Sequence, residues 1–277
     1  LRGDKSFDPG TEWLYVQYKP YSDLKLRVGR VVMPAFLYSD VINVGYAVPW
    51  FRAPNEIYDS LPFDYIDGAQ IQWQHAFGPV QLGAEFSYGD ASATFKLSGI
   101  ELPADSKNTV NGAIWLSWGN LLVRYAQTDL RTGLDFALGP QLQVNTSLSD
   151  YFHCYGLQYD NGRALFMSEW IKRNEDSLEP FGKPVGVERG WYVAAGWRFG
   201  KLTPLATYST LNLLDSLITP PASYHTWGAS LRYDVVQNLD LKIQVNRAMA
   251  DNGTYWTTPQ YTQDRINVYS LGADFVF

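Results

Sequence analysis

The sequence predicts an all-β protein, a single antiparallel β-barrel that crosses a membrane, and three observations lead to this expectation. Apolar and polar residues alternate with a period of two along the whole chain. Aromatic residues make up 16% of the chain, and Trp and Tyr gather near the ends of the alternating segments. Short turns alternate strictly with long connections between these segments, as in transmembrane barrels, whose two ends face different compartments.

The alternation is clearest in residues 189–199 and 223–235, where one face is apolar with aromatic ends and the other is small, polar or charged. A soluble β-sandwich would bury a mainly aliphatic face instead. The pattern predicts strands at residues 11–19, 23–33, 68–77, 79–89, 107–118, 120–129, 150–160, 163–173, 189–199, 202–211, 223–235, 239–249 and 266–277.

The connections fall into two classes. The short ones carry residues that favour tight turns, such as Gly78-Pro79, Gly119-Asn120 and Asp160-Asn161-Gly162. We expect these turns on the periplasmic side and the long loops on the extracellular side. The long loops are predicted at residues 34–67, 90–106, 130–149, 174–188, 212–222 and 250–265.

Length and charge restrict the other possibilities. The 277 residues are compatible with one β domain, residues 1–277. No window holds the roughly 18 to 20 consecutive apolar residues that a membrane-spanning helix requires. The net charge of −6, without a basic stripe, excludes nucleic acid as a partner. The single cysteine, Cys154, cannot form an internal disulfide, and no Cys/His spacing predicts a metal site or a cofactor.

The last predicted strand, residues 266–277, resembles the C-terminal signal of outer-membrane barrels, with apolar residues at every second position and a terminal Phe277. The resemblance implies that the barrel-insertion machinery reads this strand. Counting back from a periplasmic C-terminus places residue 1 on the outside. Because bacterial single-chain barrels have even strand numbers, we expect one or three N-terminal strands to be missing, with Leu1-Arg2-Gly3 as the end of one of them.

The architecture as a whole resembles Gram-negative porins. Sixteen strands, the porin number, would make residues 34–67 the third extracellular loop, which in general porins folds into the barrel and narrows the pore. The run Leu26-Arg27-Val28-Gly29-Arg30, with Pro34 and residues 46–54 after it, resembles a pattern in a group of proteobacterial porin-like proteins. The acidic signature of the enterobacterial constriction loop is absent. The resemblance implies a homotrimeric diffusion channel for small hydrophilic solutes, surrounded by outer-membrane lipids and lipopolysaccharide.

A pore requires no catalytic group, but it requires fixed charges around a polar lumen. Alternation places mostly basic residues on the lumen face, since an arginine facing lipid at mid-bilayer would cost about 2 to 4 kcal/mol. Carboxylates of loop 34–67 would face this wall and set up a transverse field, although ordinary loop and lumen contacts explain the same charges. Ion preference stays open. The candidate pore residues are Lys25, Arg27, Arg124, Arg198 and Arg232 on the wall and Glu56, Asp59 and Asp64 in the loop.

Three alternative functions stay open. The aromatic residues of loop 34–67 could form a track for sugars or aromatic acids, or could simply pack and rigidify the loop. A plug in a missing N-terminal region would make the protein a receptor or a structural barrel. An outer-membrane enzyme requires a histidine base beside a nucleophile or carboxylate. Since His75, His153 and His225 all fall on the apolar face, we expect no catalytic residue.

Overall fold

The computed structural model describes residues 11–97, 100–137, 143–178, 186–214, 221–252, 256–258 and 261–276. Its helical part is a 3-10 turn, η1 (Gly45–Ala47), and a single helical turn, α1 (Asn55–Tyr58). Within these ranges no helix is long and apolar enough to cross a membrane. The strands are β1 (Leu14–Tyr21), β2 (Leu24–Val32), β3 (Tyr65–Phe77), β4 (Val80–Leu97), β5 (Ile100–Trp118), β6 (Leu121–Ala137), β7 (Gln143–Asp160), β8 (Ala164–Leu178), β9 (Gly186–Trp197), β10 (Leu202–Leu214), β11 (Ala222–Val236), β12 (Leu239–Asn252), β13 (Trp256–Thr258), β14 (Tyr261–Gln263) and β15 (Arg265–Phe275).

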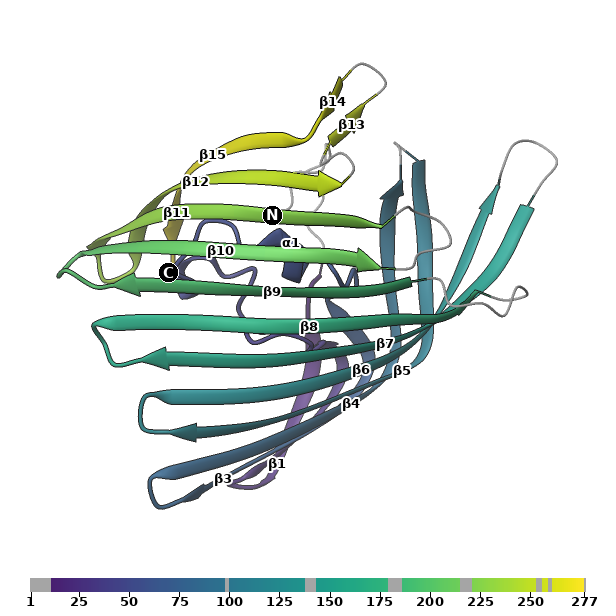
Figure 1. Ribbon diagram of the computed structural model, residues 1–277. Coiled ribbons are helices and arrows are strands. Elements are labelled where there is room, and N and C mark those ends of the chain that lie inside the picture. The colour runs from purple at the N-terminus through teal and green to yellow at the C-terminus, as the bar shows by residue number, and fades with distance from the viewer. Residues whose placement is uncertain are drawn as a thin grey trace.

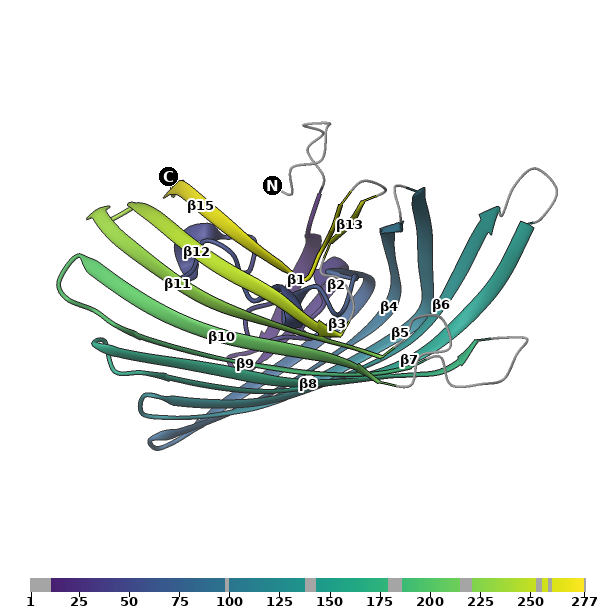
Figure 2. The ribbon, with the colours of Figure 1, turned by 45° about the horizontal axis from the view of Figure 1, so that its top comes forward.

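Thirteen strands form one antiparallel sheet in the order of the chain, from β1 to β12 and then β15, while β13 and β14 form a separate hairpin. The sheet curves into an open trough with β1 at one edge and β15 at the other (Figure 1 and Figure 2). This arrangement confirms the predicted all-β antiparallel fold and each of the predicted strands. The count of sixteen strands for the whole barrel stays a prediction, and Phe277 and Leu1-Arg2-Gly3 lie outside the described residues.

The predicted short turns join the strands at one end of the sheet, the left end in Figure 1. Gly78 and Gly119 adopt φ angles of 62° and 57°, in the left-handed region that residues with a Cβ rarely adopt. These two glycines allow the chain to reverse within two residues between β3 and β4 and between β5 and β6. The turn prediction is therefore confirmed together with its physical reason.

The strand ends on the opposite side extend further than the sequence predicts. The extensions carry polar residues on both faces, as at Ser92, Asp105 and Ser106, and backbone pairing continues across them. A pattern that detects one apolar face cannot detect such strands. Trp256–Thr258 and Tyr261–Gln263 also pair with each other, as the strands β13 and β14. All six predicted long loops therefore include residues of the observed strands, most of all loops 90–106, 130–149, 174–188 and 250–265.

The two faces of the sheet differ in the way that the alternation predicts. The convex face carries exposed apolar side chains, with Leu271 at 80% exposure and Tyr269 at 77%. The histidines lie among aromatic rings of this face, since His75, for example, lies 4.5 Å from the ring of Phe77. Such a surface fits hydrocarbon better than water. The concave face carries small and polar side chains, and it positions the candidate site.

Candidate functional site

The connection between β2 and β3, residues 33–64, lies in the concavity of the sheet, and we call it the inner loop (Figure 2). Its backbone turns through short-range hydrogen bonds, as from Val41 N to Tyr38 O at 3.0 Å and from Val44 N to Val41 O at 2.9 Å. Pro54 precedes α1 and accepts a hydrogen bond from Ile57 N at 3.0 Å. The loop thus has a regular local structure of its own before it contacts the wall.

Aromatic rings pack the inner loop against the wall. The ring of Trp50 lies 5.9 Å from that of Tyr192 in β9 and 6.3 Å from that of Tyr58. Phe36 contacts Phe152 of β7 edge to face at 5.3 Å. These rings are buried, and aromatic contacts of this geometry add to the free energy of apolar burial. They act in packing, which is the second of the two explanations that the sequence left open for the loop's aromatic residues.

One carboxylate behind the loop, that of Glu169 in β8, accepts hydrogen bonds from several donors. Leu37 N donates at 2.7 Å, and Tyr192 Oη and Cys154 Sγ each donate at 3.1 Å. The hydroxyl of Tyr58 also donates to it. Burial raises the pKa of the Tyr58 phenol well above its usual value, so this donor stays protonated. Glu169 is fully buried. Because its donors come from the loop, from β7 and from β9, this residue of β8 connects the loop to three strands.

The predicted loop carboxylate Glu56 has a comparable position in α1. It is 4% exposed and accepts a hydrogen bond from Ser209 Oγ of β10 at 2.8 Å. The hydroxyl of Thr226 in β11 donates to its other oxygen. Glu56 thus faces the wall, as the sequence predicts, and the groups that donate to it there are the hydroxyls of Ser209 and Thr226. It holds the helical turn against β10 and β11.

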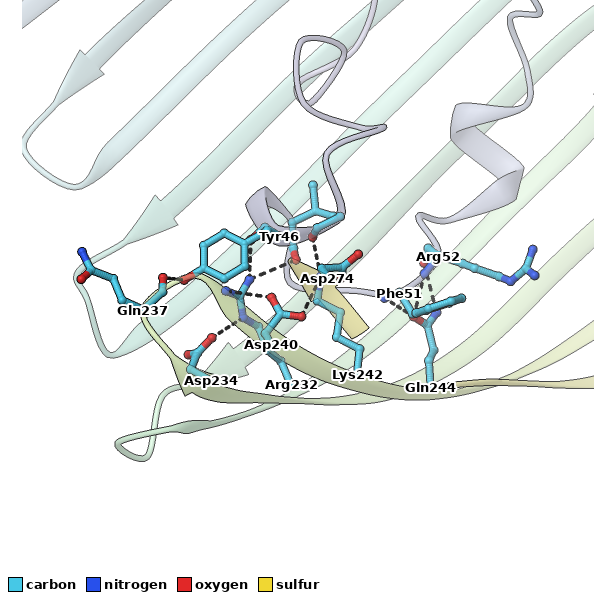
Figure 3. A network of polar contacts seen from close by, with 12 residues as sticks. Tyr46, Phe51, Arg52, Arg232, Asp234, Gln237, Asp240, Lys242, Gln244 and Asp274 are labelled. Atoms are coloured by element: carbon cyan, nitrogen blue, oxygen red, sulfur yellow. Dashed lines mark hydrogen bonds and ion pairs between the residues drawn. The ribbon is translucent and has the colours of Figure 1, made fainter. Parts of the chain in front are cut away.

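Arg232 of β11 fixes the part of the loop around η1 (Figure 3). Its guanidinium donates to Tyr46 O at 2.7 Å and to Val48 O at 3.3 Å. It also lies 4.7 Å from the centre of the Tyr46 ring, a cation–π contact. Its charge is balanced by the fully buried Asp240 at 3.0 Å. Arg232 therefore binds the loop backbone.

Two neighbours on β12 complete this attachment (Figure 3). Lys242 donates to Gly45 O and pairs with Asp274 of β15 at 2.9 Å. The side-chain amide of Gln244 accepts from Phe51 N at 2.8 Å and from Arg52 N at 3.0 Å, and it donates to Arg52 O at 3.0 Å. The Gln244 amide thus forms hydrogen bonds with three backbone groups of the loop. These bonds replace the backbone hydrogen bonds that the loop would form in a helix or a sheet.

Arginines also bind both ends of the inner loop. Arg124 of β6 donates to Pro34 O near the start of the loop and lies 3.6 Å from Glu85. Arg173 of β8 donates to Ser60 O near its end at 3.2 Å. Both guanidinium groups are largely buried. The structure thus brings Arg124 and Arg232, together with Arg173 and Lys242, under the loop.

The remaining predicted wall residues lie elsewhere. Arg198 forms a two-fold pair with Asp160 at 2.5 and 2.8 Å near the turn end. Arg27 of β2 donates to Gln70 at 2.8 Å and to Gln17 at 3.0 Å, and Lys25 lies 3.3 Å from Gln72. In the part of the chain that the structure describes, no carboxylate forms an ion pair with Lys25 or Arg27. These two cations, bound to neutral amides and partly exposed, differ from the arginines under the loop.

Sequence reasoning placed Glu169, Arg173, Lys242 and Gln244 on the lumen face but did not select them as site residues. A signal for Glu169 exists in the sequence, because Met167 and Ile171 lie on the same face two positions away on either side. Apolar residues on a lumen face indicate that something covers it. The partners themselves cannot be found from the pattern, because they are mostly backbone groups of the loop.

The other side of the inner loop borders a cavity of about 760 Å³. Asp59 and Asp64, two of the predicted loop residues, are exposed there, as is Asp40. Carboxylates outnumber basic groups among the described residues around this cavity. Its charged lining consists of Glu12, Asp40, Asp59, Asp64 and Asp274, with Arg52.

The described residues contain no group of three or more His, Cys, Asp or Glu that could hold a metal ion. His75 pairs with Asp23 at 2.5 Å, and His153 Nδ1 lies 2.9 Å from the hydroxyl of Tyr125. His225 lies 3.3 Å from Asp251. None of these contacts lies on the inner loop, and all three histidines belong to the convex face.

No protein-family model and no curated protein matches the sequence. Solved structures match it in fold. OmpT of Vibrio cholerae aligns with a TM-score of 0.64 and 14% identity over 92% of this chain and 77% of its own. The anion-selective porin from Comamonas acidovorans gives 0.55 and 11% over 90% and 74%. The outer-membrane channel DcaP of Acinetobacter baumannii gives 0.53 and 11% over 90% and 71%.

At these identities the similarity concerns the fold alone. The chain has the β-barrel fold of outer-membrane porins, which confirms the predicted fold class and the resemblance that the sequence showed. The fold also supports the expected location in a Gram-negative outer membrane.

Proposed function

We propose that this chain forms a water-filled channel in the outer membrane, through which small hydrophilic solutes diffuse passively, and that the inner loop sets its narrowest part. The attachment of this loop to the concave wall is the observation that carries the proposal. Glu169, Arg232 and Gln244 bind loop groups that would otherwise require water. A loop held in this way narrows the lumen and stays in place while solutes pass. A channel of this kind needs no catalytic group.

The proposed solute path runs past the concave face of β2, where Lys25 and Arg27 are partly exposed, and along the cavity side of the inner loop. The wall there carries Lys25 and Arg27 beside neutral amides. Glu85 of β4 lies 3.6 Å from Arg124, whose guanidinium also donates to Pro34 O at the start of the inner loop. Positive charge on β2 and negative charge on the loop create a transverse field that orients dipolar solutes.

The proposed channel prefers cations. The charges around the cavity are mainly carboxylates, and Asp40 is one that lies at an exposed position, whereas the arginines under the loop are largely buried against carboxylates and loop carbonyls. Buried charges contribute little net field to a solvent-filled path, whereas charges at its surface attract counterions. The sequence left the ion preference open. The proposed preference for cations follows because the loop covers arginines of the wall and leaves several of its own carboxylates at the cavity.

We also propose the homotrimer and the role of Phe277 in insertion that the resemblance to porins implies. Removal of Phe277 is expected to lower the amount of folded protein in the outer membrane, measured by heat-modifiable mobility in gels of membrane fractions. Crosslinking in those membranes should give a trimer. A monomer with normal conductance would contradict the trimer and leave the channel proposal intact.

The channel proposal is tested by swelling of liposomes that contain the purified, folded protein in isosmotic solutions of neutral sugars. Swelling rates that fall steadily with increasing sugar size are expected, because an aqueous path sieves by diameter. Equal rates with and without protein would contradict an open channel. A fast rate for one sugar only would instead support a substrate-specific channel.

A further inference from the structure

A row of basic side chains interrupts the apolar convex face on the loop side of β7, β8 and β9. His153 lies directly opposite Lys172, and Lys172 lies directly opposite Arg189. Opposite residues on neighbouring strands point to the same face. Their sequence neighbours Ile171 and Gly190 are buried on the concave side. We call His153, Lys172 and Arg189 the basic row, and it faces the membrane side of the sheet.

Among the side chains that the structure describes, none gives the basic row an anionic partner. No carboxylate among the described residues forms an ion pair with Lys172 or Arg189, and Arg189 is exposed. Two described carboxylates near the row in sequence, Glu175 and Glu188, point to the concave face and pair with Arg173 at 3.2 and 3.9 Å. Like charges directly opposite each other on neighbouring strands repel. An anion from outside the sheet would remove this repulsion.

An aromatic ledge lies next to the basic row, two residues nearer to the turn end. The rings of Tyr155 and Trp170 lie 5.5 Å apart, and those of Tyr125 and Tyr155 lie 4.9 Å apart. Trp191 continues the ledge opposite Trp170. Trp and Tyr gather at the level of lipid headgroups in membrane proteins. The basic row, just beyond the ledge, therefore lies where the phosphate groups of lipids lie.

We propose that the basic row binds the phosphate groups of lipopolysaccharide in the outer leaflet, while the acyl chains pack on the aromatic ledge. Lys172 and Arg189 donate to phosphate oxygens, and the fork of the guanidinium suits two oxygens of one phosphate. Nδ1 of His153 is already held by the Tyr125 hydroxyl, which fixes the ring and leaves Nε2 for the headgroup. This inference rests on the proposed outer-membrane location but not on conduction.

The test compares the full chain with the double variant Lys172→Gln/Arg189→Gln. The proteins are folded in detergent, and the binding of purified lipid A is measured by native mass spectrometry. Loss of two headgroup contacts is expected to weaken binding by about 30-fold, given the usual contribution of a basic residue at an anionic membrane surface. Lipid A from which the phosphates have been removed should bind the wild type and the variant equally.

The matched control is Lys19→Gln/Arg163→Gln, which removes the same charge from exposed positions at the turn end of the barrel. Lipid A should bind this control as it binds the wild type. Equal binding to all three proteins, or an equal loss in the control, would overturn the proposal. Competition by inorganic phosphate at the same phosphate concentration would overturn the assignment to a lipid. Liposome swelling should be unchanged in the Lys172/Arg189 variant, so failure of this proposal is distinct from failure of the channel.

Discussion

The concave wall of the sheet has two parts. Alternation of apolar and polar residues places basic side chains on both parts, but these side chains have different partners. From β6 to β12 the inner loop covers the wall, and the basic side chains there bind loop carbonyls and buried carboxylates. On β2, Lys25 and Arg27 bind neutral amides and stay partly exposed, and Arg27 also lies 4.9 Å from the centre of the Tyr15 ring. An inward-facing charge is thus a structural group in one part and a candidate pore charge in the other.

The difference arises from what lies opposite each charge. A buried cation is stable only when hydrogen bonds and opposite charges replace the water it has lost. The inner loop offers backbone carbonyls to Arg124, Arg173 and Arg232, and this requirement holds the loop in place. Lys25 and Arg27 on β2 keep access to solvent, and these cations require no such partner.

The largest effect is expected from Arg173→Met, which removes the shared partner of Asp150, Glu175 and Glu188. Leaving these carboxylates without their cation should lower the free energy of unfolding by about 3 to 5 kcal/mol. Urea unfolding of the folded protein in lipid vesicles measures this loss. Arg173→Lys, which keeps the charge, should lose clearly less, and an equal loss in both variants would contradict the assigned role of the charge.

The next largest effect is expected from Glu169→Leu. The variant leaves Leu37 N and the hydroxyls of Tyr58 and Tyr192 without their acceptor, which should cost about 2 to 3 kcal/mol. The loop should also become mobile, and this is measured as increased current noise in open single channels. Glu169→Gln keeps one acceptor oxygen and should be intermediate. A quiet channel in the leucine variant would show that the loop is held without Glu169.

A smaller effect, on ion preference rather than on stability, is expected from Lys25→Gln/Arg27→Gln. Removal of two partly exposed positive charges should raise the cation-to-anion permeability ratio by about twofold at low salt, and less at high salt because of screening. The free energy of unfolding should change by less than about 0.5 kcal/mol. The double variant Lys19→Gln/Arg163→Gln, at the turn end, is the control for loss of charge alone.

The smallest effect is expected from Asp40→Asn at the cavity side of the loop. Removal of one exposed carboxylate should lower the same permeability ratio by less than about twofold, again at low salt. The reversal potential under a salt gradient measures it. A shift towards cations would reverse the proposed sign of the loop's charge.

The fold could be predicted from the sequence because each strand repeats one signal. Alternation of apolar and polar residues places β9 and β11 correctly, and Gly78 and Gly119 place their turns. The strand ends beyond the apolar band could not be predicted. Neighbouring residues such as Asp105 and Ser106 point to opposite faces there, and both are polar. Their strand structure depends on pairing with β4 and β6.

The candidate site could be predicted only as a set of side chains on one face. Alternation correctly places Arg124 and Arg232 on the concave face, but the sequence does not show that carbonyls of Pro34 and Tyr46 lie against them. These contacts join residues 90 and 186 positions apart. The assignment of Glu56 to a field across the lumen stays a prediction, while its contacts with Ser209 and Thr226 show what holds it.

The open channel is tested most sharply by single-channel conductance of the folded protein in a planar lipid bilayer, with the reversal potential measured under a salt gradient. Stable open steps with little noise are expected, because the inner loop is bound to the wall, together with a reversal potential that shows a preference for cations. Silence from correctly folded protein would contradict an open channel. Stable steps with anion preference would keep the channel and contradict the assignment of its exposed charges.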